Sequence, residues 1–390
     1  MIYYDFKDIK LSKLGLGCMR LPVKEDKTID EEQVYKMVDY ALENGINYID
    51  TAFPYHEGLS EVVIGKALSK HDRKSFYLAD KFPGHQIASE YHPDEIFEKQ
   101  LKKCNVDYFD FYLLHNVYEN SINVYEDPKW GIIDYFVKQK ELGRIKYLGF
   151  SSHAKAENLE KFLDKHEGIF DFCQIQLNYL DYSLQEADKK VEILKKRNIP
   201  IMVMEPLRGG KLVSVKEDDE TLKKLRPQEE TVDWAFNFLL RFKEVAVILS
   251  GMSSFEQLKH NIDTFNRNNP LNDEETKVIL EIAEKLKDSV PCTKCRYCTA
   301  GCPMGIDIPD MIATYNEIKN VPSTNAIMWL DTVDENSLPS ACIGCGACAS
   351  ICPQKIDIPF IMQDMTRIIE TIPSWKEICK QREEAAKKNG

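Results

Sequence analysis

Residues 45–58 read GINYIDTAFPYHEG, a glycine followed by a short apolar run that ends in an aspartate. The run predicts a β-strand over residues 47–50, and the stretch before it, residues 30–44, has the length and amphipathic pattern of a helix. Gly45 separates the two, as glycine commonly does at the end of a helix. The segment therefore predicts one helix-to-strand junction of an α/β fold.

The same alternation recurs from about residue 14 to residue 265. Apolar runs with strand character occupy residues 15–18, 47–50, 76–81, 109–115, 145–151, 172–177, 200–205 and 245–250. Helix-length stretches separate them, among them residues 93–104, 134–142 and 184–197. Eight repeats over about 250 residues predict a (β/α)8 TIM barrel. The residues before Gly15 alternate like a short hairpin, which we expect to plug the bottom of the barrel.

An open, doubly wound parallel sheet is the competing interpretation of this alternation. Such a sheet is typified by a glycine-rich fingerprint directly after its first strand. Here the corresponding stretch, residues 14–22, is LGLGCMRLP and does not continue as that fingerprint. The barrel is therefore the favoured fold.

Composition limits the partners of the chain. Its 390 residues carry a net charge of −12, which argues against general binding of nucleic acid or anionic membrane, because both need a basic surface. No apolar stretch approaches the roughly 18 residues of a membrane span. Residues 1–17 lack the order of a signal peptide, a charged stretch followed by an apolar one. We therefore expect a cytoplasmic protein with no nucleic-acid or membrane partner.

The pattern changes beyond the eighth strand. Residues 273–287 form a strongly helical run, and a region of different composition opens at Pro291. We therefore predict a barrel over residues 1–270, a connecting helix within residues 271–290 and a mainly helical domain over residues 291–390.

This last region contains an internal repeat. CTKCRYCTAGCPMGIDIPDMI begins at Cys292, and CIGCGACASICPQKIDIPFIM begins at Cys342. Two such copies predict one structural unit used twice, a loop followed by a helix. Pro309 and Pro359 suit the first turn of those helices, where proline is well tolerated.

Eight of the twelve cysteines fall in this repeat. They are Cys292, Cys295, Cys298 and Cys302, and then Cys342, Cys345, Cys348 and Cys352. Zinc, the alternative, usually takes two close pairs separated by a longer spacer. Three thiolates within seven residues can instead bind three irons of a cube while a more distant cysteine binds the fourth, so the spacing predicts two [4Fe-4S] clusters. The remaining cysteines are expected to be small buried residues, namely Cys18, Cys104, Cys173 and Cys379.

Both motifs, and the module as a whole, resemble bacterial ferredoxins. In that family the fourth cysteine of each run, which precedes a proline, binds the other cluster. The resemblance implies that Cys352 completes the cluster of Cys292, Cys295 and Cys298. It implies equally that Cys302 completes the cluster of Cys342, Cys345 and Cys348, and that electrons pass between the clusters.

Four polar residues lie where barrel active sites are built, at or just beyond the carboxyl ends of strands. They are Asp50, Tyr55, Lys81 and His115. A phenol can protonate a developing alkoxide if a neighbouring ammonium lowers its pKa. Asp50 can hold Lys81, and His115 can hydrogen-bond a carbonyl oxygen. Each residue alone has an ordinary structural explanation, but four at matching strand ends predict a carbonyl-reducing site.

The barrel resembles the aldo-keto reductases. The matching motifs are GINYIDTAFPYHEGLSEVVIGKAL, LADKF, YLLHN, GRIKYLGFSSH, FCQIQLNYLD, EPLRGGKL and ILSGMSSFEQLKHNI, and they span about residues 10–265. The resemblance implies that Tyr55 is the proton donor, that Lys81 and Asp50 tune it, and that His115 orients the substrate. It also implies an NAD(P)H site formed by Ser151, Ser152, Gln174, Met204, Leu207, Gly209, Gly210, Gly251, Gln257 and Asn261.

Two departures from the family pattern concern this cofactor. The family usually stacks a tyrosine on the nicotinamide where this chain has Met204. Members that prefer NADPH place Lys and Arg around the 2′-phosphate, where this chain has Gly251 and Gln257, with Lys259 and His260 shifted nearby. A phosphate normally needs charged donors, so the sequence does not favour NADPH.

The two predicted chemistries leave three hypotheses open, because a nicotinamide transfers a hydride whereas a cluster transfers single electrons. In the first, the barrel reduces a small carbonyl substrate with NAD(P)H, and the clusters serve a redox partner or a regulatory role. In the second, the clusters feed the barrel site through a flavin bound beside Met204. In the third, the barrel is a degenerate scaffold and the protein is an electron carrier.

Overall fold

The computed structural model describes residues 1–213, 219–286, 290, 292, 294–320, 324–352 and 354–388. Pro291, the predicted start of the last domain, and Pro353 lie outside them. The chain forms two compact units, Met1–Glu281 with Arg382–Gly390, and Ile282–Gln381. The first unit therefore extends beyond the predicted boundary at residue 270 and also includes the C-terminal segment. One reason is Arg226, whose guanidinium donates to both carboxylate oxygens of Glu275 at 2.8 and 2.6 Å.

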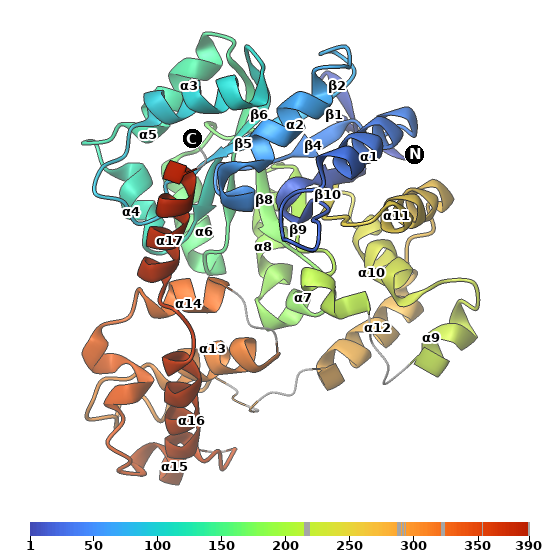
Figure 1. Cartoon of the computed structure of the whole chain (residues 1–390). Helices are drawn as coiled ribbons and strands as arrows, with labels where there is room; N and C mark the ends of the chain where they lie inside the picture. Colours follow the sequence, from blue (N-terminus) through green and yellow to red (C-terminus); the bar gives the residue numbers. More distant parts are fainter. Residues whose placement is uncertain are drawn as a thin grey trace. The chain divides into compact units, whose positions relative to one another are not determined.

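The first unit is a closed barrel of eight parallel strands (Figure 1), so the TIM-barrel prediction is confirmed and the open sheet is wrong. The strands are β3 Leu14–Gly17, β4 Tyr48–Asp50, β5 Tyr77–Phe82, β6 Phe109–Val117, β7 Ile145–Ser152, β8 Phe172–Gln176, β9 Ile201–Met204 and β10 Val245–Ser250. They follow chain order around the barrel, and β10 closes it by pairing with β3. Each strand reads as a nearly continuous apolar run because both its faces are covered.

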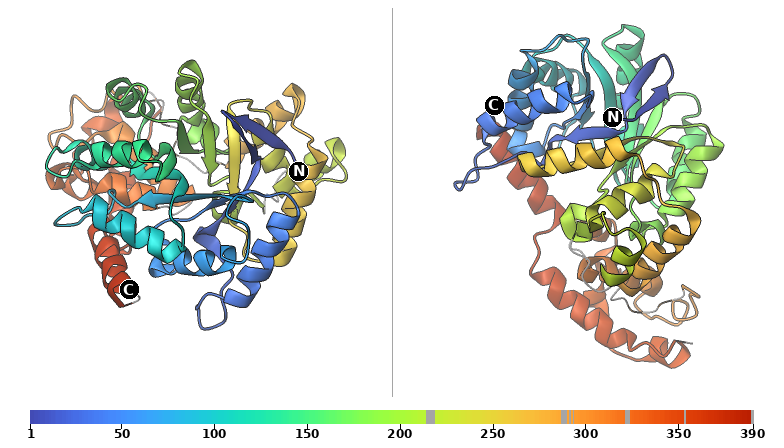
Figure 2. Two further views of the ribbon diagram at one scale, coloured as in Figure 1. Left: turned by 90° about the horizontal axis from the view of Figure 1, so that it is seen from above. Right: turned by 90° about the vertical axis from the view of Figure 1, so that its right-hand side faces the viewer.

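Helices surround the strands (Figure 2). They are α1 Glu31–Glu43, α2 Ser60–Leu68, α3 Pro93–Cys104, α4 Ser121–Glu126, α5 Ile132–Glu141, α6 Ala156–Lys165, α7 Asp181–Leu184, α8 Ala187–Lys196, α9 Asp219–Leu225, α10 Thr231–Leu240, α11 Phe255–Arg267 and α12 Asp273–Leu286. Three 3-10 turns, η1 Cys18–Arg20, η2 Tyr55–Gly58 and η3 Arg208–Val213, follow β3, β4 and β9. Among the described residues, no helix is long and apolar enough to cross a membrane.

The predicted N-terminal hairpin is present and plugs one end of the barrel. Its strands, β1 Tyr3–Phe6 and β2 Ile9–Ser12, pair antiparallel. Phe6 and Leu11 are fully buried in the cluster that fills the barrel interior. The Phe6 ring meets Phe111 edge-on at 5.4 Å, and Phe111 in turn meets Tyr48 at 5.0 Å. Because this end is filled with aromatic packing, the opposite end is left for polar side chains.

The second unit is mainly helical, as predicted. It contains α13 Ile308–Asn320, α14 Thr324–Leu330, the 3-10 turns η4 Glu335–Ser337 and η5 Pro339–Ala341, α15 Ala347–Ile351, α16 Ile358–Glu370 and the first part of α17 Trp375–Lys388. Pro309 and Pro359 lie in the first turns of α13 and α16, which confirms that prediction. The core joins the two repeats, since Ile308 and Met311 pack in one cluster with Ile358 and Met362.

Candidate active site and cluster-binding sites

Asp50 and Lys81 form a buried ion pair at the carboxyl ends of neighbouring strands. Asp50 closes β4, and Lys81 is the penultimate residue of β5. The ammonium of Lys81 donates to Asp50 Oδ1 at 2.5 Å and to the carbonyl of Thr51 at 2.7 Å. The side chain of Lys81 is 1% exposed, and that of Asp50 is 3% exposed. Such a pair holds its geometry firmly, because separating the two charges in an apolar environment is costly.

Tyr55 lies next to this pair, on the turn that follows β4. Its ring centroid is 5.0 Å from Nζ of Lys81, and the ring of His115 stands perpendicular to it at 6.0 Å. The Tyr55 amide donates to the carbonyl of Ala52 at 3.0 Å, which fixes the start of the turn. The structure thus brings together all four residues that the sequence predicted.

The protonation states suit an acid rather than a phenolate. Burial raises the pKa of Tyr55 to about 12, and the nearby Lys81 opposes this only in part. Lys81 thus lowers the pKa of the phenol, as the sequence predicts, but desolvation exceeds this attraction and leaves the pKa above its ordinary value. Burial alone would lower the pKa of Lys81, but Asp50 and Tyr55 raise it, so the lysine stays charged.

His115 sits at an irregularity of its strand. The pairing of β6 with β7 shifts between Leu114 and Val117, and Asn116 has a positive φ of 58°. Such bulges re-aim side chains at active sites. Burial lowers the pKa of His115 well below its ordinary value, and the charges of His85 and Lys81 act in the same direction. The imidazole is therefore neutral, and within the described residues its Nδ1 has no hydrogen-bond partner.

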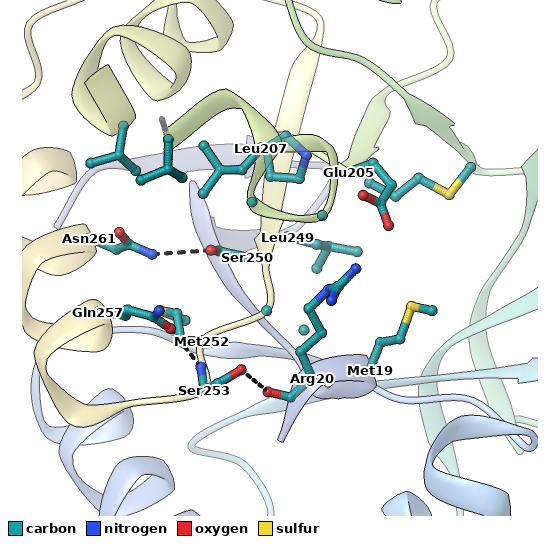
Figure 3. Close-up of a pocket in the computed structure, with 18 of the residues that line it drawn as sticks. Met19, Arg20, Glu205, Leu207, Leu249, Ser250, Met252, Ser253, Gln257 and Asn261 are labelled. Atoms are coloured by element: carbon teal, nitrogen blue, oxygen red, sulfur yellow. Dashed lines mark hydrogen bonds between the residues drawn. The ribbon is translucent and has the colours of Figure 1, made fainter. Parts of the chain in front are cut away.

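A cavity of about 480 Å3 opens beside this site (Figure 3). Its walls include Asp50 and Tyr55 together with eight of the ten predicted cofactor residues. Those eight are Gln174, Met204, Leu207, Gly209, Gly210, Gly251, Gln257 and Asn261. The volume lies within the range of cofactor sites in proteins. The size and the lining of the cavity are therefore compatible with a dinucleotide.

Ser151 and Ser152, the other two predicted cofactor residues, do not line this cavity. Ser151 Oγ accepts a hydrogen bond from the Asn116 amide at 2.7 Å, and Ser152 Oγ donates to the carbonyl of Val117 at 2.9 Å. Both hydroxyls therefore support the irregular end of β6 that carries His115. Their contact with a nicotinamide stays a prediction.

One wall of the cavity is a tight loop. Gly209 and Gly210 have φ of 67° and 93°, a backbone region that glycine enters without steric cost. The buried side chain of Arg208 lies 3.5 Å from Asp181 on α7, an ion pair that ties the loop to the barrel. Backbone amides held in such a loop suit a diphosphate.

The charges on the cavity wall are mostly negative. Glu205, Glu230 and Glu256 line it, and Arg20 is the one arginine among the described lining residues. Figure 3 shows Arg20 extending along the cavity from the turn after β3. Polar contacts order the far end, where Asn261 donates to Ser250 Oγ at 3.1 Å and Gln257 accepts from the Ser253 amide at 2.8 Å.

In the second unit, the eight motif cysteines surround two small cavities. One is lined by Cys292, Cys295, Cys298 and Cys352, with apolar walls that include Ile312 and Ile356. The other is lined by Cys302, Cys342, Cys345 and Cys348, with walls that include Ile306 and Met362. Each cavity thus receives three cysteines of one motif and the last cysteine of the other.

The chemistry of these sites fits clusters better than zinc. Among the described residues, no three side chains of His, Cys, Asp or Glu converge closely enough to hold a single ion. In a four-iron cluster each cysteine binds a different iron, so the sulfurs need not meet at one point. Cys298 and Cys348 are buried, whereas Cys295 and Cys345 are exposed. The four cysteines outside the motifs, Cys18, Cys104, Cys173 and Cys379, are all buried, as predicted.

Comparison with known proteins agrees with this architecture. Residues 13–284 match the model of the aldo/keto reductase family. The chain belongs to the aldo/keto reductase family. Residues 291–356 match a 4Fe-4S dicluster domain, so this family member carries an iron-sulfur domain after its barrel.

Its relatives within the family are distant. An uncharacterised oxidoreductase of Bacillus subtilis (strain 168) is 25% identical over 70% of this chain and 92% of its own length. An NADH-specific methylglyoxal reductase of Escherichia coli (strain K12) is 24% identical over 72% of this chain and 97% of its own length. The structure of an aldo-keto reductase from Bacillus halodurans superposes with a TM-score of 0.58, at 27% identity over 72% of this chain and 95% of that one.

Sequence reasoning missed three groups around the reductase site. His85 and His153 follow β5 and β7, on either side of the strand that carries His115. The rule that strand ends build the site could have found both. Arg382 lies far along the chain in the segment that joins the barrel's unit, and no local pattern marks it.

Proposed function

We propose that the barrel reduces a small carbonyl compound with NAD(P)H, or oxidises the corresponding alcohol in the reverse direction. The observation that carries this proposal is the meeting of Tyr55, Lys81 and His115 beside a cavity that fits a dinucleotide. The family match supports an oxidoreductase that acts on small carbonyls.

Each residue has a distinct part in this reaction. When bound, the reduced nicotinamide supplies a hydride to the carbonyl carbon. Tyr55 donates its phenolic proton to the carbonyl oxygen, and its pKa of about 12 keeps that proton in place until the oxygen gains charge. Lys81, held by Asp50, stabilises the resulting phenolate. The neutral imidazole of His115 hydrogen-bonds the carbonyl oxygen and aligns it.

We propose further that NADH is preferred to NADPH. Glu230 and Glu256 line the cavity together with Gln257 and Asn261 and would repel a 2′-phosphate, and Arg20 offsets these charges only in part. The E. coli relative, whose name specifies NADH, supports the same preference. The ratio of kcat/KM for NADH to that for NADPH tests it, and a ratio below one would overturn it.

For the second unit, we propose two [4Fe-4S] clusters bound by crossed ligand sets. The grouping of cysteines around the two cavities supports this assignment. Because clusters transfer single electrons, their partner is expected to be a one-electron redox protein. The matched families lend no support to a flavin beside Met204. The proximity of Asp50, Tyr55, Lys81 and His115 argues against a degenerate barrel.

The reductase proposal is tested by Tyr55→Phe in the full chain, purified anaerobically. We expect carbonyl reduction to fall by at least ~100-fold, because general acid catalysis is lost, while NADH binding is retained. Tyr4→Phe, in the hairpin that plugs the other end of the barrel, is the matched control. If Tyr55→Phe reduces aldehydes within threefold of the wild-type rate, the assignment of the proton donor is wrong.

A further inference from the structure

The turn that carries Tyr55 holds three consecutive residues in the left-handed backbone region. His56 and Glu57 have φ of 50° and 57°, and Gly58 has φ of 85°. Glycine adopts this region without steric cost, whereas other residues are disfavoured there and persist only where the surrounding structure holds them. The Leu21 amide holds His56 by donating to its Nε2 at 3.1 Å. A strained run directly after the proposed proton donor therefore depends on contacts from neighbouring elements.

Lys103, the penultimate residue of α3, contacts this turn on both sides of Tyr55. Its ammonium donates to the carbonyl of Gly58 at 2.8 Å. The same ammonium lies 5.1 Å from the centre of the Phe53 ring, within the range of a cation–π contact. Phe53 is two residues before Tyr55 and Gly58 is three residues after it, so one side chain holds both arms of the turn.

Lys103 is also anchored to the strand that carries Lys81. Its ammonium donates to Glu61 Oε2 at 3.1 Å, and Glu61, on α2, is fully buried. The side-chain amide of Gln100 donates to Glu61 Oε1 at 3.0 Å and to the carbonyl of Lys81 at 3.1 Å. Lys103, Glu61 and Gln100 thus form a bridge, the Lys103 bridge, that runs from the carbonyl of Gly58 to the carbonyl of Lys81.

The bridge requires a close approach of α2 and α3, which a glycine permits. A Cβ on Gly65 would lie 2.6 Å from the carbonyl oxygen of Lys103, so a larger residue would push the helices apart. Glu61 lies four residues before Gly65 and therefore on the same face of α2. Burial, and then the charge of Glu61, raises the pKa of the neighbouring Asp80 well above its ordinary value. The neutral form of Asp80 is favoured, which leaves Glu61 as the charged partner of Lys103.

We propose that Lys103 is a positioning residue of the reductase site. It holds the left-handed turn through Gly58 and thereby sets the position of the Tyr55 phenol relative to Lys81. This inference rests on the proposed carbonyl reduction and adds a residue that is not among the described lining of the cofactor cavity. Misplacing a reacting group by about 1 Å can cost ~100-fold in rate, so loss of this contact should be measurable in kcat.

The test measures reduction of 4-nitrobenzaldehyde with NADH by the full chain with its clusters. Lys103→Met keeps the apolar stem but removes the bonds to Gly58 and Glu61. We expect kcat to fall ~10-fold or more, while the dissociation constant of NADH stays within about twofold. Lys103→Arg should restore at least about a third of kcat, because a guanidinium can donate to the same carbonyl. Lys102→Met, at the exposed neighbour on α3, is the matched control and should behave as the wild type.

A double-mutant cycle with Tyr55→Phe separates positioning from a general structural role. If Lys103 acts through the phenol, adding Lys103→Met to Tyr55→Phe should change the remaining rate by less than about twofold. If Lys103→Met lowers the rate of Tyr55→Phe by the same factor as it lowers that of the wild type, Lys103 does not act through Tyr55 and the proposal is wrong.

Lys103→Met also leaves the buried carboxylate of Glu61 without its partner, so stability needs a separate variant. Lys103→Met with Glu61→Gln removes both charges and should regain most of the melting temperature that the single variant loses. Its kcat should stay as low, because the carbonyl of Gly58 still lacks its donor. A double variant that regains the wild-type kcat together with the melting temperature would show that Lys103 contributes stability alone, which overturns the proposal.

Hydrogen exchange tells failure of this proposal apart from failure of the reductase proposal. The amides of residues 51–60 should exchange at least ~10-fold faster in the Lys103→Met, Glu61→Gln variant than in the wild type, and at the wild-type rate in Lys102→Met. If the wild type reduces no aldehyde but the exchange changes in this way, the Lys103 bridge holds the turn and the reductase proposal fails. If the exchange of these amides is unchanged in the double variant, the positioning proposal fails whatever the rates.

Discussion

The barrel and the iron-sulfur domain build their sites in opposite ways. In the domain, three cysteines of each proposed set lie within seven residues, and only the fourth comes from the other motif. In the barrel, Asp50, Tyr55, Lys81 and His115 come from three strands and one turn. A cluster needs several cysteine ligands around one compact cofactor, and a single loop can supply most of them. Carbonyl reduction needs different groups at set distances, which only a rigid scaffold can supply.

Double cysteine substitutions test the proposed ligand sets of the iron-sulfur domain, and their effect on iron content should be the largest of the predicted effects. If the ligand sets cross as proposed, Cys302→Ser with Cys345→Ser removes two ligands from one cluster and leaves the other intact. Cys302→Ser with Cys295→Ser removes one ligand from each. We expect about half of the wild-type iron in the first double variant and almost none in the second.

Iron and sulfide analysis of anaerobically purified protein measures this difference. Cys104→Ser with Cys173→Ser, both outside the motifs, is the matched control and should keep all the iron. The reverse result, in which the Cys302 and Cys295 variant keeps about half of the iron and the Cys302 and Cys345 variant keeps almost none, would mean that each motif binds its own cluster.

Lys81→Met probes the barrel side. It leaves the Asp50 carboxylate buried without its partner, and we expect the barrel to lose about 3–5 kcal/mol of unfolding free energy together with its reductase activity. The iron content should not change, because every proposed cluster ligand lies in the other unit. Denaturant unfolding followed alongside iron analysis checks both parts. Lys36→Met, on an exposed helix face, should behave as the wild type.

Acidification should destabilise the barrel through its buried histidines. His85 has a pKa of about 3 when folded and an ordinary value of about 6.5 when unfolded, so the unfolded chain takes up the proton first as the pH falls. The contribution of neutral His85 to the free energy of unfolding is therefore fully present above pH 6.5 and is lost progressively as the pH falls toward 3. Between pH 7 and pH 5 we expect His85 to account for a loss of about 2 kcal/mol.

His85→Gln measures this contribution, since the variant should lose about 2 kcal/mol less than the wild type over the same interval. The groups that act on His85 are His115, His153 and Arg382, and all three are unchanged in the variant. Unfolding curves at the two pH values give the difference. The exposed His92→Gln serves as control, and identical pH profiles of His85→Gln and the wild type would contradict the prediction.

The smallest effect is expected at Gly209, in the loop that forms one wall of the proposed cofactor cavity. Gly209→Ala places a side chain at a φ of 67°, with its Cβ 3.0 Å from Nη2 of Arg20. We expect a loss of about 1 kcal/mol in stability and an NADH dissociation constant raised about fivefold. Gly143→Ala meets a similar φ of 75° in open space, so it should lose stability without losing NADH affinity. Equal NADH affinity in both variants would show that the loop of Gly209 does not take part in NADH binding.

Much of the barrel site was predictable because it depends on position along strands. The eight apolar runs predicted the strands, and the polar residues at their ends predicted Asp50, Lys81 and His115. The pKa of Tyr55 was not predictable, because the sequence identifies the neighbouring cation but not the depth of burial that opposes it. Arg382 was not predictable either, since nothing local indicates that the last residues belong with the barrel.

The sequence by itself determined the fold class, the two-part organisation and the residue types of both sites, because strand periodicity and cysteine spacing are local properties of a chain. Only the tertiary structure decided which groups face one another. It grouped Cys352 with Cys298 and Cys302 with Cys348, and it brought the segment of Arg382 to the turn that carries Tyr55. The physical reason is that burial and charge act through space, between residues whose separation along the chain carries no information about their distance.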